Sequence, residues 1–162
     1  MNELGNCDAL QNVHAMEIDQ FCRMWVIDVG RVHIDTDSPD NKCPPKLVLI
    51  DLQTDKVLRT YVFPEQVVSR TSNFLNDIAV GCTTKEDCWA YITDASDGKI
   101  IAYSHQQNKG WYVKHEDSMK AQEEAKQIQI EGKSILSGFF LSLRYSVEGR
   151  RPEIYFPYIS MR

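Results

Sequence analysis

The sequence lacks the short patterns that usually assign an activity. Its 162 residues contain no GxSxG, HExxH or P-loop sequence, so no nucleophile elbow, zinc protease site or nucleotide cradle is indicated. No apolar run approaches the roughly 20 residues that a membrane helix needs. The N-terminal stretch has neither a basic start nor an apolar core, so no signal peptide is visible. We therefore expect no catalytic residue, no metal, no cofactor and no membrane partner.

Clustered positive charge is also missing. The chain has 18 Lys and Arg against 23 Asp and Glu, a formal net charge of −5, and its basic residues are scattered. A protein that binds nucleic acid or an anionic membrane usually presents a basic patch, so neither partner is expected. Hydrophobic residues make up 43% of the chain, which is ordinary for a soluble domain with its own core.

The sequence does contain a duplication. Residues 46–60, KLVLIDLQTDKVLRT, align without a gap with residues 99–113, KIIAYSHQQNKGWYV, 53 positions later. A further apolar segment precedes each copy and ends at Asp28 or Asp94. The loop that follows has 17 residues in the first unit and 4 in the second. Self-similar units of about forty to fifty residues with several strands each are typical of a β-propeller or a related array.

Runs of β-branched and aromatic residues predict an all-β fold made of propeller blades with four antiparallel strands. One blade spans residues 13–64 and a second spans 75–114, while two strands within 137–160 open a third. The segment 115–132 fits a helix and a long polar loop equally well. Two and a half blades leave an incomplete ring with uncovered strand edges. We therefore expect residues 1–162 to form part of a longer propeller.

The five cysteines have no CxxC spacing, which disfavours zinc and redox sites and favours disulfides. Cys22 begins the strand that leads into the long loop and Cys43 ends that loop, so we predict a bridge between these two residues. Cys82 and Cys88 flank a turn in the second unit and form the next predicted pair. Cys7 is then the unpaired cysteine.

Several blocks of the sequence, taken in order, resemble the Yellow / major royal jelly protein family. They are residues 22–30, 43–64, 89–104, 108–111 and 135–142. The blocks occur in the family's order and cover most of positions 7–158, and the ordered set, with the segment CPPKL (43–47), is specific to the family. It implies a secreted, six-bladed β-propeller, of which this chain would form roughly the second to fourth blades.

Candidate ligand-binding residues follow from propeller geometry, because the inner strand of each blade lines a central channel. The polar or aromatic residues expected on inner strands, or at the ends of the next strands, are His14, Asn76, Asp77, Phe139, Asp28 and Asp94. For Asp28 and Asp94 the favoured alternative is a structural one, because an Asp at a strand end commonly accepts hydrogen bonds from the following turn. For Asn76 and Asp77 the structural and ligand-binding interpretations are equally weighted.

Two classes of function remain open at this point. The preferred one, implied by the resemblance, is a propeller that binds a small amphipathic ligand such as a biogenic amine or a catechol, or that has a structural or pigment-associated role. The alternative is an enzyme, either one that converts dopachrome in melanin formation or a metal-dependent, lactonase-like propeller. A metal-dependent enzyme should bring three or more oxygen ligands together, about 2.3–2.6 Å from a calcium ion.

Overall fold

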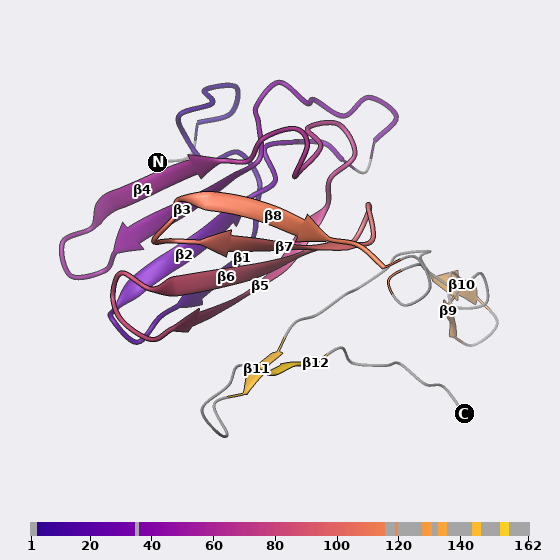
Figure 1. Cartoon of the computed structure of the whole chain (residues 1–162). Coiled ribbons are helices and arrows are strands. Elements are labelled where there is room, and N and C mark those ends of the chain that lie inside the picture. The colour runs from indigo at the N-terminus through magenta and orange to yellow at the C-terminus, as the bar shows by residue number, and fades with distance from the viewer. Residues whose placement is uncertain are drawn as a thin grey trace.

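The structure, a computed structural model, describes residues 3–34, 36–115 and 119, together with the backbone of four short strands further along the chain. Residues 13–113 form two four-stranded sheets and their connections (Figure 1), and in each sheet the strands follow one another in sequence order. The first sheet contains β1 (Val13–Ile18), β2 (Arg23–Asp28), β3 (Lys46–Asp51) and β4 (Lys56–Val62). The second contains β5 (Leu75–Cys82), β6 (Cys88–Asp94), β7 (Lys99–Ser104) and β8 (Lys109–Val113). All neighbouring strands are antiparallel, which confirms the predicted fold class.

The two copies of the repeated sequence have the same strand register. Asp28 pairs with Lys46 across β2 and β3, and Asp94 pairs with Lys99 across β6 and β7. Each pair brings an ammonium nitrogen to 3.6 Å from a carboxylate oxygen in a buried environment. The aspartates and lysines that the repeat aligned therefore occupy equivalent positions in the two ladders.

The two sheets pack against each other through one hydrophobic core, as their face-to-face arrangement in Figure 1 indicates. Trp25, Ile27 and Leu49 of the first sheet contact a cluster that includes Ile92 and Ile101 of the second, and all five are nearly or completely buried. These side chains stand at alternate positions of the central strands and so lie on one face, while the intervening residues Val26, Val48 and Ile50 form a second buried cluster on the other face of the first sheet. Burial at this junction positions β1 and β5 beside each other.

The chain beyond residue 115 is described only in part. Strand β9 (Ile128–Ile130) pairs with β10 (Lys133–Ile135), and β11 (Arg144–Ser146) pairs with β12 (Glu153–Tyr155). Most of the predicted third unit, 137–160, including Phe139, lies outside the described residues. In the part of the chain that the structure describes, no helix is long and apolar enough to cross a membrane.

The disulfide prediction is right for one pair and wrong for the other. Cys82 and Cys88 form a bridge, as expected, with their Cα atoms 4.1 Å apart. Cys43, however, is bonded to Cys7, with a Cα separation of 5.1 Å, and Cys22 is the free cysteine.

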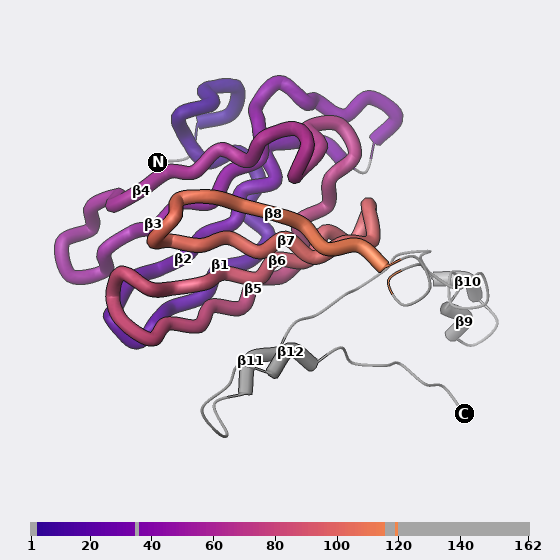
Figure 2. Tube along the Cα trace, in the orientation of Figure 1, coloured from indigo at the N-terminus to yellow at the C-terminus, as the bar shows by residue number. Residues whose placement is uncertain are grey.

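The error arose because the loop 29–45 starts at the far end of β2 from Cys22. A strand of six residues spans about 20 Å, so Cys22 and Cys43 lie near opposite ends of the first sheet. The N-terminal segment lies instead beside the end of this loop (Figure 2), where Lys46 Nζ donates hydrogen bonds to the carbonyl oxygens of Cys7 and Ala9 at 2.6 and 2.5 Å. These contacts bring Cys7 to Cys43.

This arrangement predicts a ranking of cysteine substitutions by stability. Removing the Cys7–Cys43 bridge by double substitution to Ser should lower the free energy of unfolding by about 4 kcal/mol, because the bridge closes a long loop. Removing Cys82–Cys88 should cost about 2 kcal/mol, because its loop is short. Cys22→Ser is the control and should change stability by less than about 0.5 kcal/mol. Urea unfolding measures all three, and a large loss for Cys22→Ser would contradict the assigned pairing.

Candidate functional site

Two of the predicted ligand residues occupy β-bulges at equivalent places in the inner strands. In the first sheet Val13 pairs with Asp28 and Ala15 with Ile27, which leaves His14 as the extra residue of β1. In the second sheet Leu75 pairs with Asp94 and Asp77 with Thr93, which leaves Asn76 as the extra residue of β5. A bulge redirects a side chain out of the regular alternation and is common beside functional sites.

The two bulges lie next to each other because β1 and β5 are neighbours. The His14 ring nitrogen Nδ1 is 3.1 Å from the carbonyl oxygen of Leu75, and the imidazole contacts the ring of Phe74 with centroids 4.9 Å apart. Asp77 follows directly, with its backbone N–H donating to Thr93 Oγ1 at 3.1 Å. The structure thus brings His14, Asn76 and Asp77 onto two adjacent strands.

Asp28 and Asp94 determine where these inner strands begin. Asp28 Oδ1 accepts a hydrogen bond from the backbone N–H of Asn12 at 2.9 Å, and Asp94 Oδ1 accepts one from Phe74 at the same distance. Asn12 and Phe74 both stand two residues before the bulge. Their carbonyl oxygens in turn accept hydrogen bonds at 2.9 Å from Val29 and Ala95, the residues after each aspartate. The structural interpretation of the two aspartates, as acceptors for nearby backbone groups, accounts for these contacts.

The two aspartates differ in electrostatic environment. Asp28 accepts further N–H hydrogen bonds from Gln11 and Gly30, each at 3.0 Å. Among the described residues, Asp94 Oδ2 has no hydrogen-bond partner, although Lys99 Nζ lies 3.6 Å away. Burial raises the pKa of Asp94, an effect that the hydrogen bond from Phe74 only partly offsets. The burial of the Asp94 carboxylate is therefore less well offset by hydrogen bonds than the burial of the Asp28 carboxylate.

A second acidic side chain, Glu17, lies close to Asp77. The pKa of Glu17 is raised, first by burial and then by repulsion from the Asp77 carboxylate. Glu17 stands on β1 three residues after His14, and its side chain is mostly exposed, so solvent weakens both effects. Sequence reasoning placed the strand but missed this residue, because the approach of the two carboxylates depends on how β1 and β5 pack.

An open hollow of about 390 Å³ borders His14 at the end of the sheets where the long loop lies. It is lined by Gln11, Asn12, His14, Val32, His33, Ile34 and Thr36. The second unit has only a four-residue connection at the equivalent place, so the longer loop of the first unit supplies one side of the hollow. The sequence showed this difference in loop length, but it did not show that the loop lies against β1.

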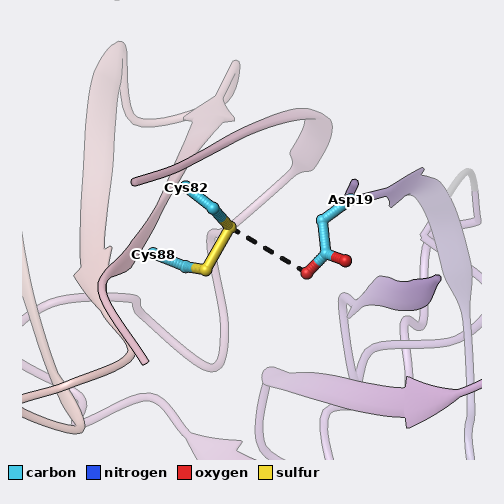
Figure 3. Close-up of side chains that lie close together, drawn as sticks. All are labelled: Asp19, Cys82 and Cys88. Atoms are coloured by element: carbon cyan, nitrogen blue, oxygen red, sulfur yellow. Dashed lines mark hydrogen bonds between the residues drawn. A yellow bond between two sulfur atoms is a disulfide. The ribbon is translucent and has the colours of Figure 1, made fainter. Parts of the chain in front are cut away.

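A separate cluster lies at the opposite end of the same strands, where Asp19, Cys82 and Cys88 bring a carboxylate oxygen and two sulfur atoms within 4.8 Å of one another. Figure 3 shows the Asp19 carboxylate pointing toward the disulfide. The sulfurs are bonded to each other, and the Arg23 guanidinium already contacts both Asp19 Oδ2, at 2.8 Å, and Cys88 Sγ, at 3.0 Å. A cationic side chain therefore occupies the place where a metal ion would contact this group.

With this geometry established, comparison with known proteins identifies the family. A family model described as major royal jelly protein matches residues 11–162, which is nearly the whole chain. The chain belongs to the major royal jelly protein family. The match includes both described sheets and continues through the residues beyond 115, so the family resemblance seen in the sequence is confirmed.

Curated relatives of this royal jelly family member carry the name Protein yellow. The Drosophila erecta protein is 34% identical over 112 residues, which cover 68% of this chain and 20% of the relative. The Drosophila melanogaster protein is 33% identical with the same coverage, and that of Drosophila subobscura is 31% identical, with 19% of the relative covered. The matched segment thus spans about one fifth of these relatives.

The two strand-end aspartates give a matched pair of stability predictions. Asp28→Asn leaves Lys46 buried without its counter-charge, so it should lower the free energy of unfolding by about 3–5 kcal/mol at neutral pH. Asp94→Asn should cost less, about 1–2 kcal/mol, because Lys99 keeps Asp97 as a counter-charge at 2.9 Å and because burial of the Asp94 carboxylate is poorly compensated. Urea unfolding of both variants at pH 7 tests the ranking.

The pH dependence of the same pair provides a further check. A raised folded-state pKa means that the folded protein holds the Asp94 proton more tightly than the unfolded chain does. The stability of the wild type relative to Asp94→Asn should therefore increase as pH falls through the raised pKa toward the ordinary value near 4. A difference that decreases on acidification would contradict the environment assigned to Asp94.

Proposed function

We propose that this royal jelly family protein is secreted and binds a small amphipathic cation of the biogenic amine class on the inner-strand side of its sheets. The observation that carries the proposal is the matched pair of bulges, which present His14 and Asn76 from adjacent strands. A bulge interrupts the hydrogen-bonded ladder, and bulges are common beside functional sites. Bulges at the same place in both sheets therefore favour a functional role for the residues that they present.

The charges beside the bulges favour a cationic ligand. The pKa of Glu17 is raised first by burial and then by repulsion from the Asp77 carboxylate. A ligand ammonium placed near them would relieve this repulsion and form charge-assisted hydrogen bonds. The two causes of the Glu17 shift, burial and the Asp77 charge, both disfavour a second negative charge at this place. The electrostatic environment is therefore suited to a positive group rather than to an anion.

The surroundings of His14 suit the aromatic part of such a ligand. The imidazole and the Phe74 ring form a tilted pair, and the adjacent hollow of about 390 Å³ is within the range of small-molecule sites. Aromatic rings of a ligand can pack on such a pair through dispersion and edge contacts. The chain also has the two disulfides typical of proteins from oxidising compartments, which supports secretion.

The enzymatic alternative receives no comparable support from the described residues. Of the candidate oxygen ligands Asp28, Asp94, Asn76 and Asp77, the first two direct their carboxylates at backbone N–H groups and at a buried lysine. A catechol-binding or pigment-associated role uses the same aromatic and acidic groups as the amine proposal. It is therefore an outcome of the same binding experiment.

Substitution of the inner-strand carboxylate tests the ligand class. Asp77→Asn should weaken binding of serotonin or dopamine by about 1–3 kcal/mol, because a charge-assisted hydrogen bond becomes a neutral one. Asp55→Asn, the same change in an exposed turn between β3 and β4, is the matched control and should leave affinity unchanged. Isothermal titration calorimetry on the chain and on the full-length protein provides the measurement. Equal affinities for wild type and Asp77→Asn would exclude Asp77, and turnover of dopachrome above the buffer rate would favour the enzyme.

Amine affinity should also depend on pH in one direction. Because the folded-state pKa of Glu17 is raised, its proton is held more tightly than usual, and an ammonium ligand must compete with that proton. Affinity should be constant near neutral pH and should fall on acidification as Glu17 takes up its proton, which begins above the ordinary glutamate value of about 4.3 because the pKa of Glu17 is raised by burial and by Asp77. Calorimetry at pH 7 and pH 4.5 measures the change. Glu17→Gln should flatten the upper part of the profile, and an affinity that rises on acidification would contradict the site.

A further inference from the structure

The junction between the two sheets contains a disulfide in contact with a buried ion pair. Arg23, at the start of β2, donates from Nε to Asp19 Oδ2 at 2.8 Å and from Nη2 to Cys88 Sγ at 3.0 Å. Trp25 Nε1 donates to the same Asp19 oxygen at 2.8 Å. Asp19, Arg23 and Trp25 belong to the first sheet region, whereas Cys82 and Cys88 end the β5–β6 ladder of the second.

The charges around the two sulfur atoms are not symmetric. Arg23 Nη2 lies 3.0 Å from Cys88 Sγ and 3.8 Å from Cys82 Sγ. The Asp19 carboxylate is placed the other way, with Oδ2 3.9 Å from Cys82 Sγ (Figure 3). Cys88 is completely buried, while Cys82 is only partly buried. The more accessible sulfur is thus the one further from the cation.

This asymmetry matters for thiol–disulfide exchange. In that reaction a thiolate attacks one sulfur and the other leaves as a thiolate, and the rate rises when the leaving thiolate is stabilised. A guanidinium group beside a sulfur stabilises the thiolate form. Cys82 therefore has the access that the attacked sulfur needs, and Cys88 has the cation that the leaving sulfur needs.

We propose that Cys82–Cys88 is a thiol-exchange site for small thiols, with Cys82 as the attacked sulfur. A thiolate of the glutathione type forms a bond to Cys82 Sγ as the Cys82–Cys88 bond breaks, and the electron pair leaves on Cys88 Sγ beside Arg23. A second thiolate then attacks the small thiol's sulfur in the mixed disulfide. This releases Cys82 as a thiolate that takes a proton from water, and the small thiol is oxidised to its own disulfide.

The other groups at the junction moderate the effect without reversing the asymmetry. The carbonyl oxygens of Thr84 and Lys85 lie 3.3 and 3.8 Å from Cys88 Sγ and would favour its thiol form. Lys85 O, however, accepts a hydrogen bond from Arg23 Nη1 at 2.7 Å, which holds the guanidinium in place. The Asp19 charge is compensated by Arg23 and Trp25 rather than directed at Cys88.

The second disulfide of the same molecule is an internal reference. Cys7 and Cys43 are 36 residues apart in sequence, against 6 for Cys82 and Cys88, so the reference bridge restricts the unfolded chain more. Its nearby cation, Lys46, donates to the Cys7 carbonyl oxygen. Both differences lead us to expect slower reduction of Cys7–Cys43.

The first experiment uses the folded chain with Cys22→Ser, which removes the free thiol, and reduced glutathione as the probe. Samples are quenched with acid at intervals, alkylated and analysed by peptide mass spectrometry. Cys82–Cys88 should open at least tenfold faster than Cys7–Cys43, with the transient glutathione adduct on Cys82. An adduct found mainly on Cys88, or faster opening of Cys7–Cys43, would overturn the proposal.

The second experiment measures the thiol pKa in a pair of variants on the same background. Cys82→Ser leaves Cys88 beside Arg23, and its thiol should titrate below the ordinary value near 8.5. Cys88→Ser leaves Cys82, whose thiol should titrate at least one unit higher than Cys88 in the first variant. Arg23→Lys should slow exchange less than Arg23→Met, with circular dichroism as the check on folding. If Arg23→Met does not fold, the two cysteine variants decide, and equal thiol pKa values would refute the role of Arg23.

Discussion

The arrangement depends on one repeated interaction, in which a buried aspartate at the end of a blade's second strand fixes the chain that enters the inner strand. Asp28 and Asp94 accept hydrogen bonds from the residues two positions before each bulge. A lysine on the third strand compensates each charge. A buried charge with such partners tolerates little displacement, since losing one partner leaves the other uncompensated. The position of the inner strand, and of whatever it presents, follows from this contact.

The two units share these aspartate and lysine contacts but differ in the segments and charges that surround them. The first adds a long loop, which is joined to the N-terminal segment by Cys7–Cys43 and borders the hollow beside His14. The second has a short connection and instead carries Asp77, whose charge acts on Glu17 of the first unit. The hollow beside His14 and the Arg23–disulfide contact lie at opposite ends of the strands. The two proposals, ligand binding and thiol exchange, can therefore be tested independently.

The strands and their order could be predicted from the sequence because the same hydrophobic alternation occurs in both copies of the repeat. The sequence also predicted the equivalence of Asp28 with Asp94, which the ladder register confirms. It failed for Cys22 because linear proximity to a loop does not show at which end of a strand a residue lies. Glu17 and the bulges at His14 and Asn76 could not be predicted, since a bulge is a property of pairing and the Glu17–Asp77 repulsion arises from packing between sheets.

A bulged residue stands outside the pairing that fixes its neighbours in the ladder. In the register of their own sheets, His14 and Asn76 are the extra residues and oppose no residue on β2 or β6. The first unit has an imidazole at this position and the second has an amide, on the same backbone frame. The two units therefore present different side-chain chemistry on the inner surface while the aspartate–lysine pairing across their second and third strands is the same.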